Sequence, residues 1–107
     1  KQGRPWSIGK GFDASAPIGP ITPIDQAGDI AKAAIWLQVN GADRQRSTVA
    51  QLIWNIAETI EHLSAAWELA PGDLIYTGTP EGVGAVVRGD TLEGGVDGLT
   101  PLRLSVV

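Results

Sequence analysis

The most regular alternation of hydrophobic positions lies between residues 35 and 39. Isoleucine, leucine and valine recur there at every second position, so they share one face of an extended chain. Asn40 and Gly41 follow at once, and both residue types tolerate the positive φ angles of a tight hairpin turn. The pattern therefore predicts a β-hairpin whose return strand runs over residues 42–46.

A longer hydrophobic stripe with helical spacing comes next. Between residues 49 and 63 the large apolar side chains recur three and four positions apart, which places them on one side of a helix. Thr48 and Gln51 have the spacing of a capping box, in which two side chains satisfy free backbone donors. The sequence thus predicts one long helix that begins near Thr48, fades by residue 66 and ends before a Pro-Gly pair.

Residues 1–23 are rich in glycine and proline, a composition incompatible with a long helix or a central strand. Large apolar side chains occur here too, and we expect an ordered loop at the edge of the fold that buries them. These side chains are Trp6, Ile8, Phe12, Ile18 and Ile21. The polar residues 25–32 predict a short turn or the approach to the following strand.

Short apolar runs at 73–77, 85–87 and 102–107 predict further strands, with glycine-rich turns between them. Residues 78–84 are the longest of these glycine-rich connections. Several short strands separated by glycine, together with one long helix, predict an α+β fold that is mainly β, with a curled antiparallel sheet or barrel.

The composition excludes several classes of function. The chain has 107 residues and a net charge of −4, with 12 acidic and 8 basic residues and no block of like charge. A nucleic-acid partner and an anionic membrane surface are therefore both disfavoured. The absence of cysteine excludes disulfides and thiolate nucleophiles, and it agrees with a reducing cytoplasm. No apolar run approaches the roughly 20 residues of a membrane-spanning helix.

Three groups of motifs, in this order and at these spacings, carry a resemblance. They are GRPW at 3–6 with GKGFD at 9–13 and SAPIGP at 15–20; WLQVNG at 36–41 with RQ at 44–45 and IW at 53–54; and PGDLIYTGTPEGVG at 71–84. The ordered set resembles the fumarylacetoacetate hydrolase family, and its fumarylpyruvate hydrolase-like members in particular. The match extends over nearly the whole chain.

The resemblance implies a mixed sheet coiled into a sandwich or barrel-like roll, usually in a homodimer. It also implies a divalent cation, Mg²⁺ or Mn²⁺, and an acylpyruvate or related 2-oxo acid as substrate in aromatic-compound breakdown. The family's metal ligands are a Glu-x-Glu pair and an Asp that lie N-terminal to the matched region, as does the His-Glu lid of its hydrolytic members. We therefore expect residues 1–107 to be the C-terminal portion of one catalytic domain that lacks its metal-binding portion and is inactive alone, and no metal ligand is assigned here.

Two loops hold the candidate site residues. Lys10 matches the family lysine beside the metal site, where a compact ammonium offsets the negative charge of a bound carboxylate or enolate. Thr79 would hold the substrate carboxylate through its hydroxyl, and Gly78 would let the ligand approach the main chain. A solvated lysine and a plain hairpin turn are the structural alternatives.

Other polar residues are given structural roles. Gln45 is interpreted as an edge residue without a site function, and Glu58 with His62, four apart, as a surface pair on the helix because no third metal ligand accompanies them.

The leading hypothesis is thus a metal-dependent hydrolase that cleaves a carbon–carbon bond in an acylpyruvate. Isomerisation or decarboxylation of a related 2-oxo acid on the same fold is the first alternative. A non-catalytic β-rich module is the second.

Overall fold

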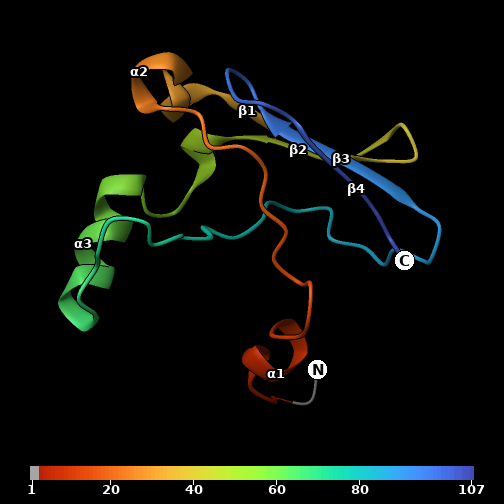
Figure 1. The fold of residues 1–107 in the computed structure, drawn as a ribbon, viewed down its shortest axis with the longest axis horizontal. Coiled ribbons are helices and arrows are strands. Elements are labelled where there is room, and N and C mark those ends of the chain that lie inside the picture. The colour runs from red at the N-terminus through yellow and green to blue at the C-terminus, as the bar shows by residue number, and fades with distance from the viewer. Residues whose placement is uncertain (1–2) are drawn as a thin grey trace.

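One antiparallel sheet organises the computed structural model, which describes residues 3–107 (Figure 1). Its strands are β1 (Ala34–Val39), β2 (Ala42–Thr48), β3 (Thr91–Val96) and β4 (Leu102–Ser105). They lie in the order β2-β1-β3-β4, and every pairing is antiparallel. The predicted α+β, mainly β class is confirmed. The sheet is open and antiparallel, however, and is not the mixed, rolled sheet that the resemblance implies.

The predicted hairpin is confirmed. Val39 and Ala42 close the β1–β2 pair, and the turn residues Asn40 and Gly41 have φ angles of 52° and 81°. Asn40 also reaches the neighbouring strand, because its Oδ1 accepts a hydrogen bond from the Thr91 N–H at 2.9 Å. The turn residue thereby joins the hairpin to the start of β3.

The return strand of the hairpin contains an extra residue. Leu37 pairs with Gln45, and Gln38 pairs with Asp43, so Arg44 has no partner across the hairpin. This is a β-bulge, in which one strand supplies two residues where the other supplies one. A bulge bends its strand and changes the direction of the neighbouring side chains.

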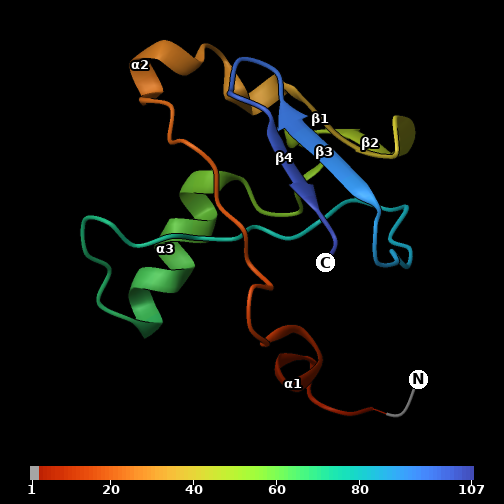
Figure 2. The same cartoon turned by 45° about the vertical axis from the view of Figure 1, so that its right-hand side comes forward.

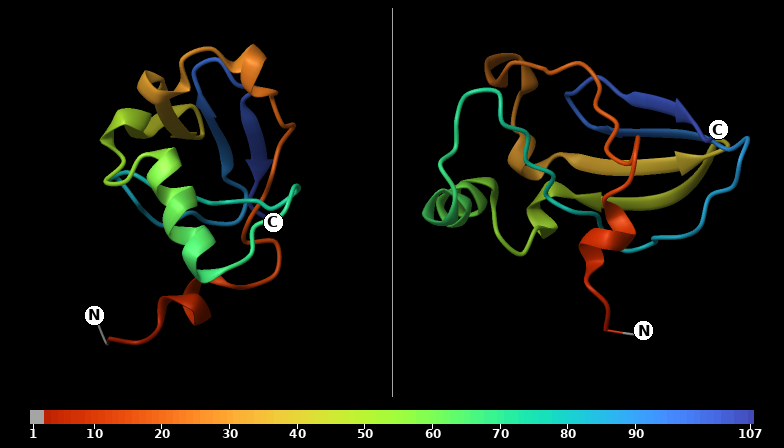
Figure 3. Two further views of the ribbon diagram at one scale, coloured as in Figure 1. Left: turned by 90° about the vertical axis from the view of Figure 1, so that its left-hand side faces the viewer. Right: turned by 60° about the horizontal axis from the view of Figure 1, so that its bottom comes forward.

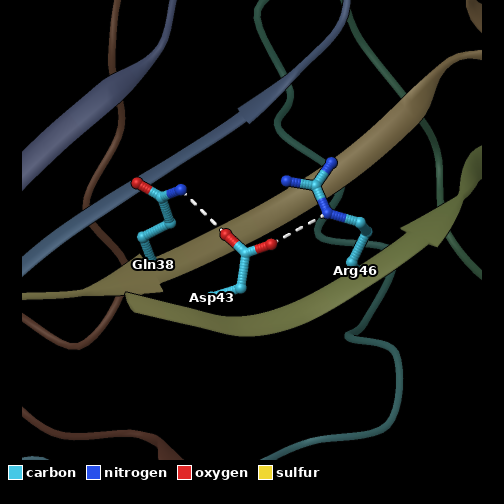
Figure 4. A network of polar contacts seen from close by, with 3 residues as sticks. All are labelled: Gln38, Asp43 and Arg46. Carbon is cyan, nitrogen blue, oxygen red and sulfur yellow. Dashed lines mark hydrogen bonds and ion pairs between the residues drawn. The ribbon is translucent and has the colours of Figure 1, made fainter. Parts of the chain in front are cut away.

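A polar network lies beside the bulge (Figure 4). The Asp43 carboxylate accepts hydrogen bonds from Gln38 Nε2 at 2.8 Å and from Arg46 Nε at 3.1 Å. These two bonds, that of Gln38 first, hold the pKa of Asp43 below its usual value. The Gln38–Asp43 bond cross-links the two strands where the bulge interrupts their register, and the Arg46–Asp43 contact lies within β2.

Strand β3 was not predicted, because Gly94 and Gly95 resemble a turn. In the structure they pair with β1, where Leu37 lies opposite Gly94 and Trp36 opposite Gly95. A methyl group added at Gly95 would lie 3.0 Å from the Trp36 ring, and one at Gly94 would lie 3.3 Å from Leu37 Cδ1. The glycines therefore make room for large side chains of the adjacent strand.

The long helix begins later than its apolar stripe indicates. Strand β2 continues to Thr48, a 3-10 turn η2 (Val49–Gln51) follows, and helix α3 runs over Ile56–Ala66. The capping box is formed by Asn55 and Glu58, each of which accepts a hydrogen bond from the other's backbone N–H. The predicted start at Thr48 was wrong because sheet pairing with Ala34 holds that residue extended.

The predicted strands at 73–77 and 85–87 are not formed. The whole segment from 70 to 90 is irregular, and it returns from the end of α3 past the sheet to the start of β3 (Figure 2). Within residues 3–107 its backbone pairs with none of the four strands, and only its end, at Gly89 and Asp90, hydrogen-bonds to the backbone of Val106 just after β4. At the C-terminus, β4 confirms the prediction for 102–107 over its first part.

The N-terminal region contains only short helices, namely α1 (Trp6–Lys10), α2 (Ile24–Ala27) and the 3-10 turn η1 (Ile30–Lys32). Helix α1 lies away from the sheet at the end of an extended stretch (Figure 3). The predicted burial of its apolar side chains was wrong, since Trp6 is 77% and Ile8 83% exposed. No helix in residues 3–107 is both long and apolar enough to cross a membrane.

Little of the described chain is fully buried. Ala27 and Val39, at 7% and 6% exposure, are its buried hydrophobic residues. The radius of gyration is 15.2 Å, whereas a compact domain of this length has about 13 Å. The single sheet has no second layer in residues 3–107 to cover it, which leaves a large apolar surface available for contact with other protein.

The observed helix start can be tested by comparing two caps. We expect Asn55→Ala to lower the free energy of unfolding by about 1 kcal/mol, because it removes the side-chain amide oxygen that accepts the Glu58 N–H in the capping box. Thr48→Val should change it by less than about 0.5 kcal/mol, because Thr48 lies in a strand that valine also favours. Urea unfolding measures both. The opposite order would contradict the helix start described above.

The turn before β3 predicts a pH effect. Asp90 accepts hydrogen bonds from the Val87 N–H and from Asn40 Nδ2, and these hold its pKa below the usual value. The resulting stabilisation is complete above the unfolded pKa of about 3.9 and is lost as the pH falls through the lower folded value. We therefore expect Asp90→Asn to destabilise the protein at neutral pH and to matter less in acid.

Urea unfolding midpoints of the wild type and of Asp90→Asn, measured at neutral pH and in acid below the usual aspartate pKa, test this expectation. The matched control is Asp97→Asn, which removes the same charge from an exposed position. An Asp90→Asn effect that is equally large in acid would be inconsistent with the hydrogen bonds to the carboxylate.

Candidate functional site

A glycine-rich loop crosses strand β2 and is held there by Gln45. Gln45 Nε2 lies 2.8 Å from Thr79 Oγ1, 2.8 Å from the Pro80 carbonyl oxygen and 3.2 Å from the Glu81 carbonyl oxygen. One amide group thus contacts three consecutive residues of the loop. We call residues 78–85 the glycine loop.

Close backbone contact adds to this attachment. A methyl group at Gly82 would lie 2.6 Å from the Arg44 carbonyl oxygen, and one at Gly84 would lie 2.5 Å from Arg44 Nη1. Arg44 Nη1 also lies 3.4 Å from the Ala85 carbonyl oxygen, to which it donates a hydrogen bond. The loop can approach the Arg44 backbone this closely only because Gly82 has no side chain, whereas at Gly84 the neighbour is the end of the flexible Arg44 side chain.

The β-bulge explains how adjacent residues reach the same loop. In a regular strand, neighbouring side chains point to opposite faces. Arg44 is the extra residue of the bulge, and Gln45 is the next residue in register with β1. The altered twist at this point lets Arg44 and Gln45 both contact the glycine loop.

The predicted substrate-binding residues lie at the start of this loop. Thr79 is exposed, and its hydroxyl oxygen is held by Gln45. Gly78 has a φ of 94°, and no atom lies within 4 Å of the position that a side chain would take. The backbone at Gly78 therefore faces open space that a ligand could enter.

Lys10 lies on a different segment, in the last turn of α1. Its side chain is exposed, and its Nζ lies 5.0 Å from the centre of the Trp6 ring. That distance suits a cation–π contact. Lys10 and Thr79 have no direct contact recorded within residues 3–107, and their meeting around one ligand stays a prediction.

One hydrogen bond links the segment before Thr79 to the segment after Lys10. Tyr76 Oη donates a hydrogen bond to the Ala16 carbonyl oxygen at 3.1 Å. Tyr76 lies shortly before the glycine loop, and Ala16 follows helix α1, which ends at Lys10. This bond links the two segments at Tyr76 and Ala16.

The carboxylates and the histidine of the described region do not form a metal site. No group of three or more His, Asp or Glu side chains within residues 3–107 could hold a metal ion. The predicted Glu58–His62 surface pair is not formed either. Glu58 caps helix α3, and the His62 ring stacks on Trp54 at a centroid distance of 4.0 Å.

Gln45 is the residue that the sequence interpretation missed. An edge strand with polar residues predicts a solvated side chain, whereas this one is partly buried and holds the loop. The signal available was the position of the Arg-Gln pair within the motif set, between the hairpin and the helix. The long-range contact itself has no sequence pattern.

Comparison with known proteins then decides the family. The family model described as "Fumarylacetoacetate (FAA) hydrolase C-terminal" matches residues 1–107. The chain belongs to the fumarylacetoacetate hydrolase family.

Individual family members agree with this assignment. Fumarylpyruvate hydrolase from Ralstonia sp is 49% identical over 105 residues, which are 98% of this chain and 54% of that protein. The mitochondrial oxaloacetate tautomerase FAHD1 of Rattus norvegicus is 40% identical over 106 residues, covering 99% of this chain and 48% of that protein. The chain thus spans about half the length of these family members.

A solved structure of the family has the same fold. The crystal structure of fumarylpyruvate hydrolase from Pseudomonas aeruginosa in complex with Mn²⁺ and pyruvate is 61% identical in sequence. It superimposes with a TM-score of 0.92 over 98% of this chain and 45% of that one.

The close approach of the glycine loop to β2 can be tested with two alanine substitutions. Gly82 and Gly72 have φ angles of 94° and 97°, but only a methyl group at Gly82 would meet other atoms within 4 Å. Positive φ alone should cost each variant about 1–3 kcal/mol. Gly82→Ala should lose clearly more, because the loop must also move away from Arg44. Urea unfolding measures both, and equal losses would contradict the contact.

Proposed function

We propose that the protein containing this chain is a metal-dependent hydrolase that cleaves a carbon–carbon bond in an acylpyruvate. Water adds across the bond, so an acylpyruvate gives a carboxylic acid and pyruvate. The observation that carries the proposal is the 61% identity, over nearly this whole chain, to a fumarylpyruvate hydrolase whose structure contains Mn²⁺ and pyruvate.

The glycine loop supports this proposal because it offers suitable groups for an anionic ligand. The hydroxyl of Thr79 is exposed next to the open main chain at Gly78. A hydroxyl and free backbone donors bind carboxylates well. In the proposed site they hold the carboxylate end of the 2-oxo acid.

Lys10 supplies the positive charge in this proposal. An ammonium near the 2-oxo acid offsets the negative charge that develops when the bond to the pyruvate part breaks. Its place on α1, between glycines at 9 and 11, leaves its side chain free to turn from Trp6 toward a ligand.

The divalent cation of the proposed enzyme is not held by residues 3–107, which lack a suitable ligand set. We propose that its ligands lie in sequence N-terminal to this region and that residues 1–107 form the C-terminal portion of one catalytic domain. When bound, such a cation polarises the carbonyl of a 2-oxo acid. A cytoplasmic homodimer completes the proposal.

Tautomerisation of a 2-oxo acid is the second candidate. It is favoured by the 40% identity to oxaloacetate tautomerase over 99% of this chain. Both reactions require the 2-oxo acid end of the substrate to be bound in the same way, and they differ in whether a carbon–carbon bond is broken.

The assay that separates these reactions uses the full-length protein with Mn²⁺ or Mg²⁺. We expect it to release pyruvate from fumarylpyruvate, while added chelator abolishes the release. Lys10→Ala should lower kcat by about a hundredfold or more, by analogy with the loss of other groups that stabilise a developing negative charge. Steady-state kinetics of pyruvate formation measure both effects.

The control for Lys10→Ala is Lys32→Ala, which removes an exposed lysine from η1 and should keep wild-type activity. If Lys10→Ala stays within a few-fold of wild type, the role of Lys10 is wrong. Interconversion of the oxaloacetate tautomers without release of pyruvate from any acylpyruvate would favour the second candidate.

A further inference from the structure

We infer that Gln45 is a positioning residue that sets the direction of the Thr79 hydroxyl, so that its proton is presented to the anionic ligand. This inference rests on the proposed function, because it assumes that Thr79 binds the carboxylate of a 2-oxo acid. It assigns a task to a side chain of strand β2 that itself need not touch the substrate.

The three contacts of Gln45 fix which group is the donor. The side-chain amide nitrogen carries two hydrogens and no lone pair for accepting. It lies 2.8 Å from Thr79 Oγ1 and from the Pro80 carbonyl oxygen. With the amide reversed, its oxygen would face carbonyl oxygens that have no hydrogen to donate, so the nitrogen must occupy this position.

The number of hydrogen bonds that a hydroxyl can donate and accept determines what Thr79 can offer a ligand. A hydroxyl has one proton to donate and two lone pairs that accept. One lone pair of Thr79 Oγ1 is used by Gln45 Nε2. No hydrogen bond recorded in residues 3–107 uses the Thr79 proton, which is therefore available for an acceptor. Accepting one bond also polarises the hydroxyl and makes it a better donor.

The strand holds Gln45 firmly enough for this task. Gln45 is partly buried and pairs with Leu37 in the sheet, immediately beside the bulged Arg44. Arg44 contacts the same loop through its carbonyl oxygen, near Gly82, and through its guanidinium, near Gly84. The loop is thus attached to the strand from Thr79 to Ala85, and the amide of Gln45 holds the hydroxyl.

The test substitutes Gln45→Glu in the full-length protein, with oxalate and Mn²⁺ as the probe. The side chains have the same shape, but a carboxylate only accepts. It must either take the Thr79 proton away from the ligand or repel the Pro80 and Glu81 carbonyls. We expect the Kd for oxalate and the KM for fumarylpyruvate to rise about tenfold or more, with a smaller change in kcat.

A double-mutant cycle with Thr79→Val identifies the route of this effect. If Gln45 acts through the hydroxyl, Gln45→Glu should weaken oxalate binding much less in the Thr79→Val background than in the wild type. An equal loss in both backgrounds would indicate a structural role only, and it would overturn the inference.

Two further variants control for charge and folding. Gln51→Glu adds the same charge at an exposed position in η2, and it should leave the Kd for oxalate unchanged. Gln45→Met keeps the volume and removes the hydrogen bonds without adding charge. If Gln45→Glu does not fold, the same cycle with Gln45→Met decides, and a rise in Kd that disappears in the Thr79→Val background supports the inference.

Failure of this inference can be told apart from failure of the proposed function. A wild-type protein that neither binds oxalate with Mn²⁺ nor releases pyruvate from fumarylpyruvate overturns both. A wild-type protein that does both, while Gln45→Glu binds oxalate equally well, overturns only the role of Gln45.

Discussion

The hydrogen bonds between the amide of Gln45 and the glycine loop are the interaction on which the candidate site depends. This loop belongs to a long irregular segment without strand partners, so its own backbone does not fix its shape. One side-chain nitrogen within 3.2 Å of three consecutive residues supplies that constraint. The position of Thr79 is therefore determined by strand β2, more than thirty residues earlier in the chain.

Missing side chains matter as much as present ones in this fold. Gly82 lets the loop reach the backbone of Arg44, and Gly95 lets Trp36 lie across β3. In each case a glycine in one segment makes room for a larger group in another. A glycine in a sequence usually indicates a turn. Here Gly95 lies in a strand and Gly82 lies where two segments are in contact.

The sequence predicted the features that depend on local interactions, and it did not predict those that depend on contacts between distant segments. The hairpin at Asn40-Gly41 was predictable because its turn chemistry and its alternation are local. The start of α3 was not, because two capping patterns compete and the pairing of Thr48 with β1 excludes the first one. The segments at 73–77 and 85–87 have the residues of strands, but no strand in residues 3–107 pairs with them.

The candidate site divides in the same way. Lys10 and Thr79 could be proposed from the sequence, because the motifs around them resemble those of the family. The contribution of Gln45 could not, since it depends on a register shift that aims two neighbouring side chains at one distant loop. A one-residue bulge has no signature of its own in a single sequence.

The same bulge has a consequence for the behaviour of the chain in solution. Strand β2 is at the edge of the sheet, and an edge strand can pair with a strand of another molecule and start aggregation. The extra residue at Arg44 interrupts the regular row of donors and acceptors, and Asp43 and Arg46 add charge beside it. The β-bulge that directs the Gln45 side chain toward the glycine loop thus also makes this edge a poor template for intermolecular β-pairing.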